Sequence, residues 1–437
     1  MNKFFIVDWR KFGDFSAVGQ LYQKIFGNIE GNCAIFQFLT NWKDQKVNFL
    51  SVAKKGSIKD EIGWKIYPDA CLSEYKSANC SKILYVRLSP HRETLELAVK
   101  LHLTDPSSPL IVHYMDKPFL EKMRPSERRY ILSLYEFLIK RARKFYTIHD
   151  SSVADLEFLY SRDVDVLGNF VNQLTYNQSL LEKGKAKENK RELVISYFGS
   201  LDQKMNADSI FKFMRAVSEM EKFQLVLYTN SGLPSYMTRL LDEADNVKVI
   251  SSNLSSLEYM QALKTSHFLL LPYNLDVASS DFLSHSFSNK VIDYIESGSK
   301  ILVIGPVKIP TIEFCITNKI GLLLNGYIDD PQDLSFAISK FYNDTSDSNL
   351  AAVISITNER LKSFESTIVN LFSSPNIDSN SNSNSNSNSN SEVGKEHLSF
   401  LIRRTLFDKK SGKQSLSASI TASILKKNGY RGFDYEI

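Results

Sequence analysis

The stretch covering residues 284–306, SHSFSNKVIDYIESGSKILVIGP, decides how we interpret the fold of this chain. It predicts a polar turn, then a short amphipathic helix that Gly298 ends, and then the buried strand ILVIGP. The first turn of the helix carries Ser288, Asn289 and Lys290. Free backbone N–H groups, the positive end of the helix dipole and an ammonium group would meet there, which predicts a diphosphate site.

A carboxylate follows the lysine on the same predicted helix. Asp293 lies near enough to Lys290 to accept hydrogen bonds from ribose hydroxyls while phosphates sit at the helix start. Lys290, Asp293 and Glu296 also fit an ordinary solvated helix face, which the spacing alone favours. The strand that follows, and the long α/β chain around it, raise the weight of the binding interpretation.

Length, composition and charge describe a globular chain with two domains. A single core stops growing near 250 to 300 residues, and this chain has 437. Residues 392–437 carry nine Lys or Arg and five Asp or Glu, so the remaining 44 basic and 44 acidic residues cancel. A basic tail on a neutral body argues against nucleic-acid binding by the main domains.

The cysteines and the apolar runs predict a cytoplasmic protein. The four cysteines form no CxxC pair and have no His at ligand spacing, so reduced thiols are the simplest interpretation: Cys33, Cys71, Cys80 and Cys315. The start, MNKFFIVDWRKF, has the wrong flanks and too short an apolar run for a signal peptide. No run of 18 apolar residues predicts a membrane span.

Apolar runs that alternate with helical sequence predict a parallel sheet in each domain. In the first half these runs are KFFIVDW, NCAIFQFL, KVNFLSVA, KILYVRLS, PLIVHYMD, KFYTIHD and VDVLGNFV. We therefore expect a Rossmann-like domain over residues 1–176, a polar linker over 177–192 and a second doubly wound α/β domain over 193–374. Ligands bind at the carboxyl ends of such strands, so two sheets that face each other would create one cleft.

Two segments leave a structural and a binding interpretation open. The helical sequence 124–144 fits a crossover helix packed on the sheet better than it fits an interfacial membrane helix. The Ser/Asn repeat within residues 375–391 predicts a flexible linker. The basic tail beyond it, residues 392–437, is more simply a solvated appendage than a segment that touches a membrane or a partner.

The stretch quoted first resembles the nucleotide-sugar-dependent glycosyltransferases of the two-Rossmann-domain (GT-B) architecture, in the large family 4, also called group 1. The resemblance covers roughly residues 1–370. The positions that match one branch of the family are Lys290, Tyr294, Gly298, Gly305 and Pro306, whereas Ser288 replaces its usual Pro. The resemblance implies that Ser286 and Asn289 bind the donor together with Lys290. Asp293 stands where the family has the Glu that binds the donor ribose, and His285 stands where a second Glu contacts the sugar.

A shorter match extends the donor site to the first strand of the second domain. The segment YFGSLDQKMN, residues 197–206, resembles a strand and turn where the family often has Gly-Arg and a downstream Lys on the diphosphate. Gly199 and Ser200 take the Gly-Arg positions. Lys204 is then the cation available to bind the diphosphate, although it lies one residue short of the common register. An ordinary surface lysine is an equal alternative.

Two segments of the first domain resemble the parts of the family that face the donor and the acceptor. FGDFSAVGQLYQKIF resembles a loop whose glycines, Gly13 and Gly19 here, approach the donor phosphates, although a tight turn is the simpler interpretation. LIVHYMDKP is similar to a His-x-Met-Asp segment in which His113 would orient a sugar and Asp116 would accept a hydroxyl hydrogen bond. A satisfied core histidine is an equal alternative for His113.

The resemblance implies transfer of a sugar from a nucleoside diphosphate sugar to a hydroxyl of a glycan or a lipid-linked acceptor, as in polysaccharide biosynthesis. Lys290, Lys204 and His113 would act in catalysis, with retention of configuration and without a metal or cofactor. Asn169 and Asn172 would shape the rim of the cleft. The implied location is cytoplasmic, with possible peripheral contact at the inner membrane face.

Two rival functions remain. The missing second Glu and the missing Arg favour a glycosyltransferase-like binding or scaffold protein without catalysis. A sugar-phosphate enzyme such as an epimerase ranks lower, because the paired carboxylates that it needs are not evident.

Overall fold

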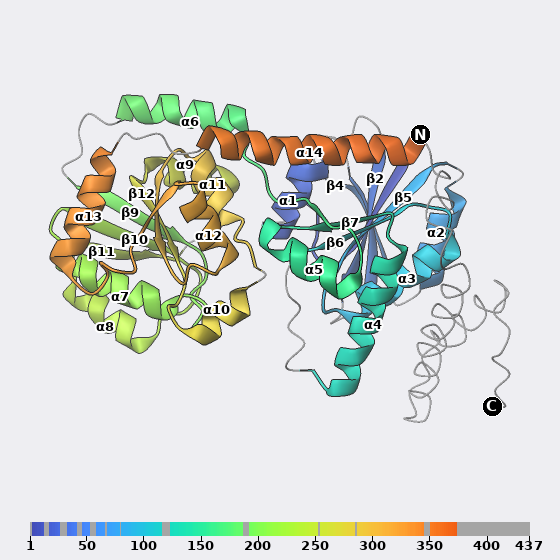
Figure 1. Cartoon of the computed structure of the whole chain (residues 1–437), viewed down its shortest axis with the longest axis horizontal. Coiled ribbons are helices and arrows are strands. Elements are labelled where there is room, and N and C mark those ends of the chain that lie inside the picture. The colour runs from blue at the N-terminus through green and yellow to red at the C-terminus, as the bar shows by residue number, and fades with distance from the viewer. Residues whose placement is uncertain are drawn as a thin grey trace. The chain divides into compact units, whose positions relative to one another are not determined.

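The computed structural model describes residues 2–12, 17–26, 33–41, 46–52, 58–65, 68–78, 80–115, 123–186, 192–251, 254–284, 286–344 and 350–373. These residues form two compact units (Figure 1). The first unit comprises the residues up to Leu167 and those from Ser363 onward. The second unit comprises Gly168–Lys362. The segments 375–391 and 392–437, together with Gly13, Asp116 and His285, lie outside the described residues.

The first unit is built on one eight-stranded sheet. Its strand order is β4-β3-β2-β1-β5-β6-β7-β8. The strands are β1 (Lys3–Asp8), β2 (Ala34–Asn41), β3 (Lys46–Val52), β4 (Ile58–Lys65), β5 (Lys82–Arg87), β6 (Leu110–Tyr114), β7 (Lys144–Thr147) and β8 (Asp165–Val166). The helices are α1 (Ala17–Phe26), α2 (Pro68–Ser77), α3 (Arg92–Thr104), α4 (Pro125–Arg141) and α5 (Val153–Tyr160).

One edge of this sheet differs from the prediction of an all-parallel sheet. The strands β2, β1, β5, β6, β7 and β8 are parallel, whereas β3 pairs antiparallel with both β2 and β4. The sequence contains the reason, because β2 ends at residue 41 and β3 begins at residue 46. A parallel crossover needs roughly a dozen residues, so a gap of this length joins antiparallel strands. The strand β4 was not predicted.

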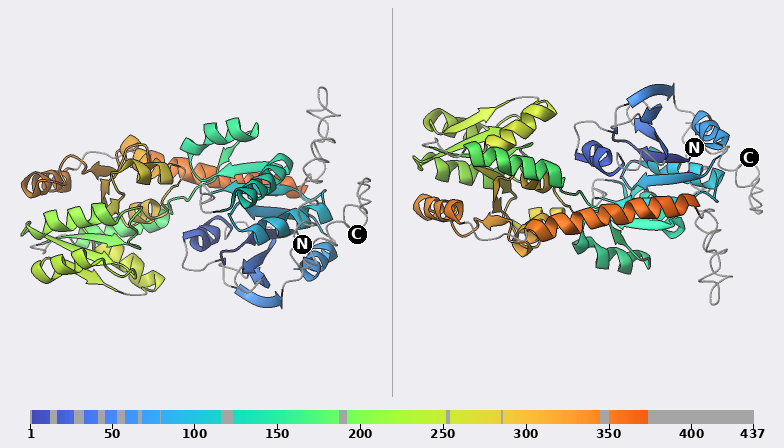
Figure 2. Two further views of the ribbon diagram at one scale, coloured as in Figure 1. Left: turned by 90° about the horizontal axis from the view of Figure 1, so that it is seen from below. Right: turned by 90° about the horizontal axis from the view of Figure 1, so that it is seen from above.

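Alternate residues of β1 face opposite sides of the sheet, as the strand period of two requires. Phe5 and Val7 belong to a core with α2, α3 and α4. On the other side, the Phe4 ring lies 5.1 Å from the Phe26 ring of α1. The Phe26 ring lies 6.0 Å from Phe364, which belongs to the last part of α14 (Leu350–Ser373). Helices therefore cover both sides of the sheet (Figure 2).

The second unit is a six-stranded sheet in which every pair is parallel, in the order β11-β10-β9-β12-β13-β14. Its strands are β9 (Leu193–Phe198), β10 (Phe223–Tyr228), β11 (Val247–Ile250), β12 (Phe268–Pro272), β13 (Lys300–Ile304) and β14 (Gly321–Leu323). Its helices are α6 (Gln173–Ala186), α7 (Ala207–Ser218), α8 (Ser235–Glu243), α9 (Ser256–Thr265), α10 (Val277–Leu283), α11 (Lys290–Glu296), α12 (Pro310–Thr317) and α13 (Pro331–Asn343). The strand order is the 3-2-1-4-5-6 pattern of dinucleotide-binding sheets, so the predicted fold class is confirmed.

The units divide at other points than the predicted domain boundary. The compact units separate after Leu167, whereas we expected the first domain to end at residue 176. The predicted linker 177–192 begins as the helix α6, which starts at Gln173. Asn172 begins this helix, because its side-chain oxygen accepts hydrogen bonds from the amides of Leu174 and Thr175 at 3.0 and 3.1 Å. Asn172 therefore caps α6, whereas Asn169 is buried and its side-chain oxygen accepts a hydrogen bond from the Phe170 amide at 3.0 Å.

The helix α4 uses its apolar face inside the first unit. Tyr130, Leu134 and Leu138 are buried in the core that α4 shares with the sheet. The structure therefore supports the crossover interpretation of segment 124–144. The apolar side chains that an interfacial helix would insert into a membrane are packed in the core instead. Among the described residues, no helix has the length and hydropathy needed to cross a membrane.

A buried ion pair links the carboxyl ends of β1 and β5. The Arg87 side chain donates two hydrogen bonds to the Asp8 carboxylate, at 2.7 and 2.8 Å. The Tyr22 hydroxyl of α1 donates a third at 2.5 Å. Both charged side chains are almost completely buried. Removing one partner of such a pair leaves the other charge buried and uncompensated.

We predict that Asp8→Ala lowers the free energy of unfolding of the first unit by about 3–5 kcal/mol, because Arg87 is left buried without its carboxylate. All three tryptophans of the chain precede Leu167 in the sequence, so their emission during urea denaturation reports the unfolding of this unit. The matched control is Asp165→Ala, which removes the exposed pair with Lys144 and should cost about 0–1 kcal/mol. Equal losses in the two variants would contradict the structural role of the buried pair.

Candidate active site

The strand order of the second unit fixes where a ligand can bind. The connections from β9 lead to β10 on one side, whereas β12 lies on the other side of β9. In open parallel sheets, ligands bind outside the carboxyl ends of the strands at such a reversal. Gly199 follows β9 there, and Tyr273 follows β12.

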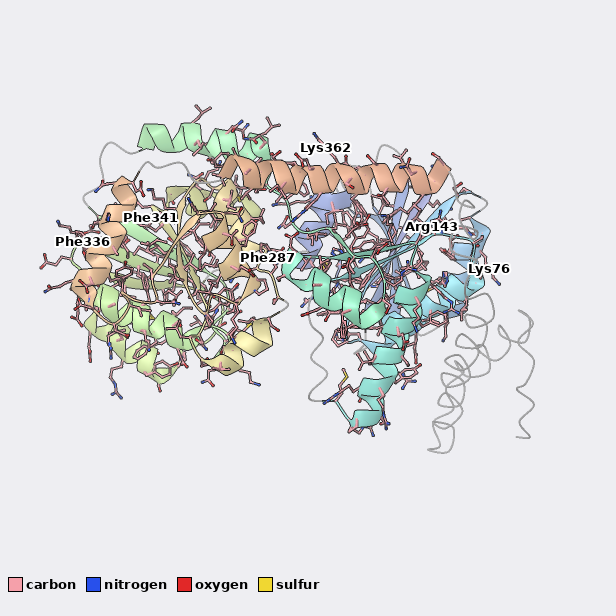
Figure 3. All side chains as sticks on the ribbon, viewed as in Figure 1. Lys76, Arg143, Phe287, Phe336, Phe341 and Lys362 are labelled. Atoms are coloured by element: carbon pink, nitrogen blue, oxygen red, sulfur yellow. The ribbon has the colours of Figure 1, made fainter. Side chains whose placement is uncertain are left out.

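The turn before α11 is held against α12, and this fixes the start of α11. Phe287, which Figure 3 labels, lies in this turn. Its ring packs edge-on against Phe314 of α12, with 5.2 Å between the ring centroids. The next residue, Ser288, donates its backbone N–H to the Thr311 hydroxyl at 2.9 Å. At the other end of α11, Gly298 has φ +68°, the left-handed conformation that ends helices, as the sequence predicted.

Lys290 is the first residue of α11, and its side chain extends to the carboxyl end of β9. A Cβ atom added to Gly199 would lie 2.0 Å from the Lys290 Nζ and 2.9 Å from its Cε. Gly199 also has φ +144°, a conformation that residues with side chains rarely adopt. The ammonium lies 5.0 Å from the centre of the Tyr197 ring. Glycine at position 199 therefore makes room for the lysine at the topological reversal.

The environment of Lys290 lowers its pKa from 10.5 to about 8. Burial of the ammonium is the largest cause, and the nearby Asp293 carboxylate raises the pKa in partial opposition. The amine is therefore mostly protonated at neutral pH, in a place where water solvates it poorly. An anion bound beside it would stabilise the charged form and raise the pKa again.

The backbone at the start of α11 differs from the prediction. We expected free N–H groups, but the amides of Val291 and Ile292 donate to the carbonyls of Ser288 and Asn289, at 3.3 and 3.1 Å. The Asp293 amide also donates to the Asn289 carbonyl, at 3.4 Å. The tight first turn satisfies these donors within the helix. The amides of Val291, Ile292 and Asp293 are therefore used within the helix, and the side chain at this point that can attract an anion is that of Lys290.

An aromatic wall lies beside Asp293, and the sequence analysis missed it. We use this name for Phe198, Tyr228 and Tyr259. The Tyr259 hydroxyl of α9 donates to the Asp293 carboxylate at 3.2 Å. The Phe198 ring stacks on Tyr228 at 4.4 Å and 4° and meets Tyr259 edge-on at 5.3 Å. Phe198 and Tyr228 are paired in register at the ends of β9 and β10.

The loop between β9 and α7 is braced from both sides. The Tyr197 hydroxyl donates to the Ser200 carbonyl at 2.7 Å and accepts from the Asn206 amide nitrogen at 2.9 Å. Asn274, which follows β12, donates to the Gln203 carbonyl at 2.7 Å. A fixed loop therefore follows Gly199, with the Ser200 side chain exposed to solvent.

Lys204 lies in the same loop, but its side chain is exposed. Its backbone carbonyl accepts a hydrogen bond from Ser279 at 2.6 Å, and its amide donates to Asp202 at 2.8 Å. The structure thus fixes the backbone of Lys204 and gives its ammonium no described partner in the site. The surface-lysine alternative is the one that this placement supports.

The other donor-site predictions fall into two groups. Ser286 and Asn289 are half-buried in the turn before α11, next to Lys290 in the chain. Tyr294 corrects the prediction, because its side chain has no exposed surface and its hydroxyl donates to the Leu270 carbonyl at 3.3 Å. Burial raises the pKa of its hydroxyl well above 10. Tyr294 therefore attaches α11 to β12 as a core residue.

His113 is a core residue of the first unit. It has no exposed surface, and one ring nitrogen shares a hydrogen bond of 2.5 Å with the Tyr85 hydroxyl. Burial is the largest cause that lowers its pKa to about 3, and the Arg87 charge adds to it. The ring is neutral at physiological pH and faces the core, which corrects the predicted catalytic and acceptor roles. Gly19 lies in the first turn of α1, which replaces the predicted loop at that residue.

The chemistry of the described site is therefore that of one cation, one carboxylate and an aromatic wall. Within the described ranges, no group of three His, Cys, Asp or Glu side chains could hold a metal ion. The four cysteines are free thiols, three of them buried. A half-buried ammonium attracts phosphate oxygens, a carboxylate accepts hydroxyl hydrogen bonds, and aromatic faces stack on planar rings.

Comparisons with known proteins place the chain by its fold. No protein-family model matches it, and no curated protein matches it. Among solved structures it is similar to HepE of Anabaena in complex with UDP, with a TM-score of 0.55 at 13% identity over 86% of this chain and 100% of that one. The HepE complex with UDP-glucose gives 0.52 at 12% identity over 86% and 100%.

A glycosyltransferase from Rickettsia africae ESF-5 is similar too, with a TM-score of 0.50 at 11% identity over 86% of this chain and 98% of that one. At such identities the likeness concerns the fold. The activity of this chain must therefore be argued from its own site.

Proposed function

We propose that this chain transfers a sugar from a nucleoside diphosphate sugar to a hydroxyl acceptor. The observation that carries the proposal is the Lys290 ammonium, held in the space that Gly199 leaves at the topological reversal of the second sheet. The fold similarity adds support, because HepE of Anabaena has been crystallised with UDP and with UDP-glucose.

The proposed role of Lys290 follows from the charge that develops in the reaction. When the bond between the sugar and the diphosphate breaks, the leaving diphosphate gains negative charge. A hydrogen-bond donor fixed beside that charge stabilises the transition state, and removing one such donor costs on the order of 3 kcal/mol in well-studied sites. The contact with Gly199 and the Tyr197 ring holds the ammonium in place before the donor binds.

Asp293 and the aromatic wall would hold the nucleoside. The Asp293 carboxylate accepts a hydrogen bond from Tyr259, and carboxylate oxygens are suitable acceptors for the ribose hydroxyls. Tyr228 is half-buried at the end of β10, and its ring offers a planar surface for the base. This division places the phosphates at Lys290 and the nucleoside toward α9.

The finer features of the proposed reaction rest on the family resemblance of the sequence. They are retention of the anomeric configuration, catalysis by side-chain cations without a metal, and a glycan or lipid-linked acceptor held by the first unit. Lys204 and His113 are left out of the proposed mechanism, because the first is exposed and the second is buried in a core.

A second candidate is a protein that binds the nucleotide sugar without turning it over. The observation that favours it is the small number of candidate catalytic groups among the described residues. In the second unit Lys290 is the half-buried cation of the site, and in the first unit His113 is buried in the core. This candidate shares the binding site with the first one and lacks the transfer step.

We predict that Lys290→Met weakens UDP binding about 10- to 100-fold, because charge-assisted hydrogen bonds are worth roughly 1.5–3 kcal/mol. Turnover of the accepted UDP-sugar should fall about 100-fold. The matched control is Lys222→Met at the amino end of β10, the edge of the sheet opposite to the site, which should change neither value. Calorimetry with UDP and a UDP-release assay measure the two effects.

The same two measurements separate the candidates. Binding of UDP that depends on Lys290, with no release of UDP from any sugar donor in a panel of acceptors, would favour the non-catalytic protein. Unchanged UDP affinity in Lys290→Met would remove this lysine from both functions.

The lowered pKa of Lys290 predicts how UDP binding depends on pH. The protonated amine binds the diphosphate, so affinity is steady below the free-protein pKa of about 8 and falls as the pH rises through it. Between pH 7.5 and pH 9.5 the loss should be on the order of 20-fold, provided that the bound ligand raises the pKa above this range. Lys290→Met should bind weakly with a flat profile over the same interval. A wild-type profile as flat as that of the variant would contradict the assignment.

A further inference from the structure

The carboxyl ends of β1 and β5 in the first unit carry a second group of polar and aromatic side chains. The Arg10 guanidinium lies over the Trp9 ring, 3.8 Å from its centroid. The His91 ring, just before α3, lies 4.4 Å from Trp9 at 58°. All three side chains are half-buried. We call these three residues the Trp9 cluster.

The Trp9 cluster carries a positive charge that its surroundings do not cancel. Arg87 lies 5.6 Å from the Trp9 ring, and its charge is matched by Asp8 through two hydrogen bonds. Among the described residues, Arg10 forms no ion pair, so its charge remains. The pKa of His91 is lowered by burial first and then by Arg87 and Arg10, against an opposing effect of Asp8.

The indole N–H of Trp9 is a second sign that a ligand belongs here. This nitrogen is buried and has no hydrogen-bond partner within the described part of the chain. A buried donor without a partner costs roughly 1–3 kcal/mol, so native proteins rarely keep one without a use. The Arg10 guanidinium and the Trp9 indole N–H are thus two hydrogen-bond donors of one cluster, beside the His91 ring.

The chemistry of these donors selects an anion with two or more oxygens. A guanidinium that is already stacked on an aromatic ring has lost part of its conformational freedom, and its planar edge suits a carboxylate or a phosphate. A neutral sugar hydroxyl would not use the charge of Arg10. The carboxyl ends of parallel strands are also where ligands of such sheets bind.

We propose that the Trp9 cluster binds the anionic group of a negatively charged sugar acceptor, a phosphate or a uronate carboxylate. The inference rests on the proposed function, in which the first unit holds the acceptor. It adds the charge of the acceptor, which neither the fold nor the resemblance defines.

The test uses the full chain with Trp42→Phe and Trp64→Phe, which leaves Trp9 as the single tryptophan. Its emission is titrated with glucose, glucose 1-phosphate, glucuronate and inorganic phosphate. We expect at least one of the two anionic sugars to change the emission with an affinity about tenfold or more above that of glucose. A response to glucose 1-phosphate alone identifies a phosphate acceptor, and a response to glucuronate alone identifies a carboxylate.

Arg10→Met in the same background should weaken that response at least about tenfold, whereas Lys11→Met, the neighbouring cation, should change it less than twofold. UDP affinity measured on each variant shows that the second unit is intact. Anion binding that survives Arg10→Met, or emission that responds equally to glucose and to both anionic sugars, overturns the proposal. Failure of wild-type protein to bind UDP would instead contradict the proposed function, and the Trp9 titration reads the acceptor site independently of it.

Discussion

The structure of the candidate site depends on one steric constraint, the missing side chain at Gly199. Any Cβ there would occupy the position of the Lys290 ammonium, and a side chain would also strain the backbone at φ +144°. The consequence is that a lysine from α11 reaches the end of the central strand β9. The rest of the site is arranged around this contact, because Phe287 and Ser288 fix the start of α11 and Tyr294 fixes its body.

The site concentrates its positive charge in one half-buried group. The amides of Val291, Ile292 and Asp293 are used within α11, and Lys204 is exposed. A single ammonium with a pKa of about 8 is then both the attraction for the diphosphate and the reason for a pH limit. The first unit has a similar arrangement at the Trp9 cluster. There the Asp8 carboxylate neutralises the charge of Arg87, and the positive charge of Arg10 remains. In both units a half-buried cation lies at the carboxyl ends of parallel strands.

The sequence predicted the features that local patterns determine. The alternating strands, the helix end at Gly298 and the position of Lys290 in the first turn of a helix all follow from neighbouring residues. The antiparallel pairing of β3 could also have been predicted, because the short gap between residues 41 and 46 excludes a parallel crossover from β2. What the sequence could not predict depends on distant partners. Thr311 bonds to Ser288, Tyr85 bonds to the buried His113, and the aromatic wall joins three separate elements.

The most direct measurement is a crystal structure of the protein with UDP bound. We expect the Lys290 Nζ within hydrogen-bonding distance, about 2.8 Å, of a diphosphate oxygen, with the ribose at Asp293. We also expect the uracil near Tyr228. A diphosphate bound elsewhere, with the Lys290 ammonium still over the Tyr197 ring and no phosphate beside it, would contradict the account.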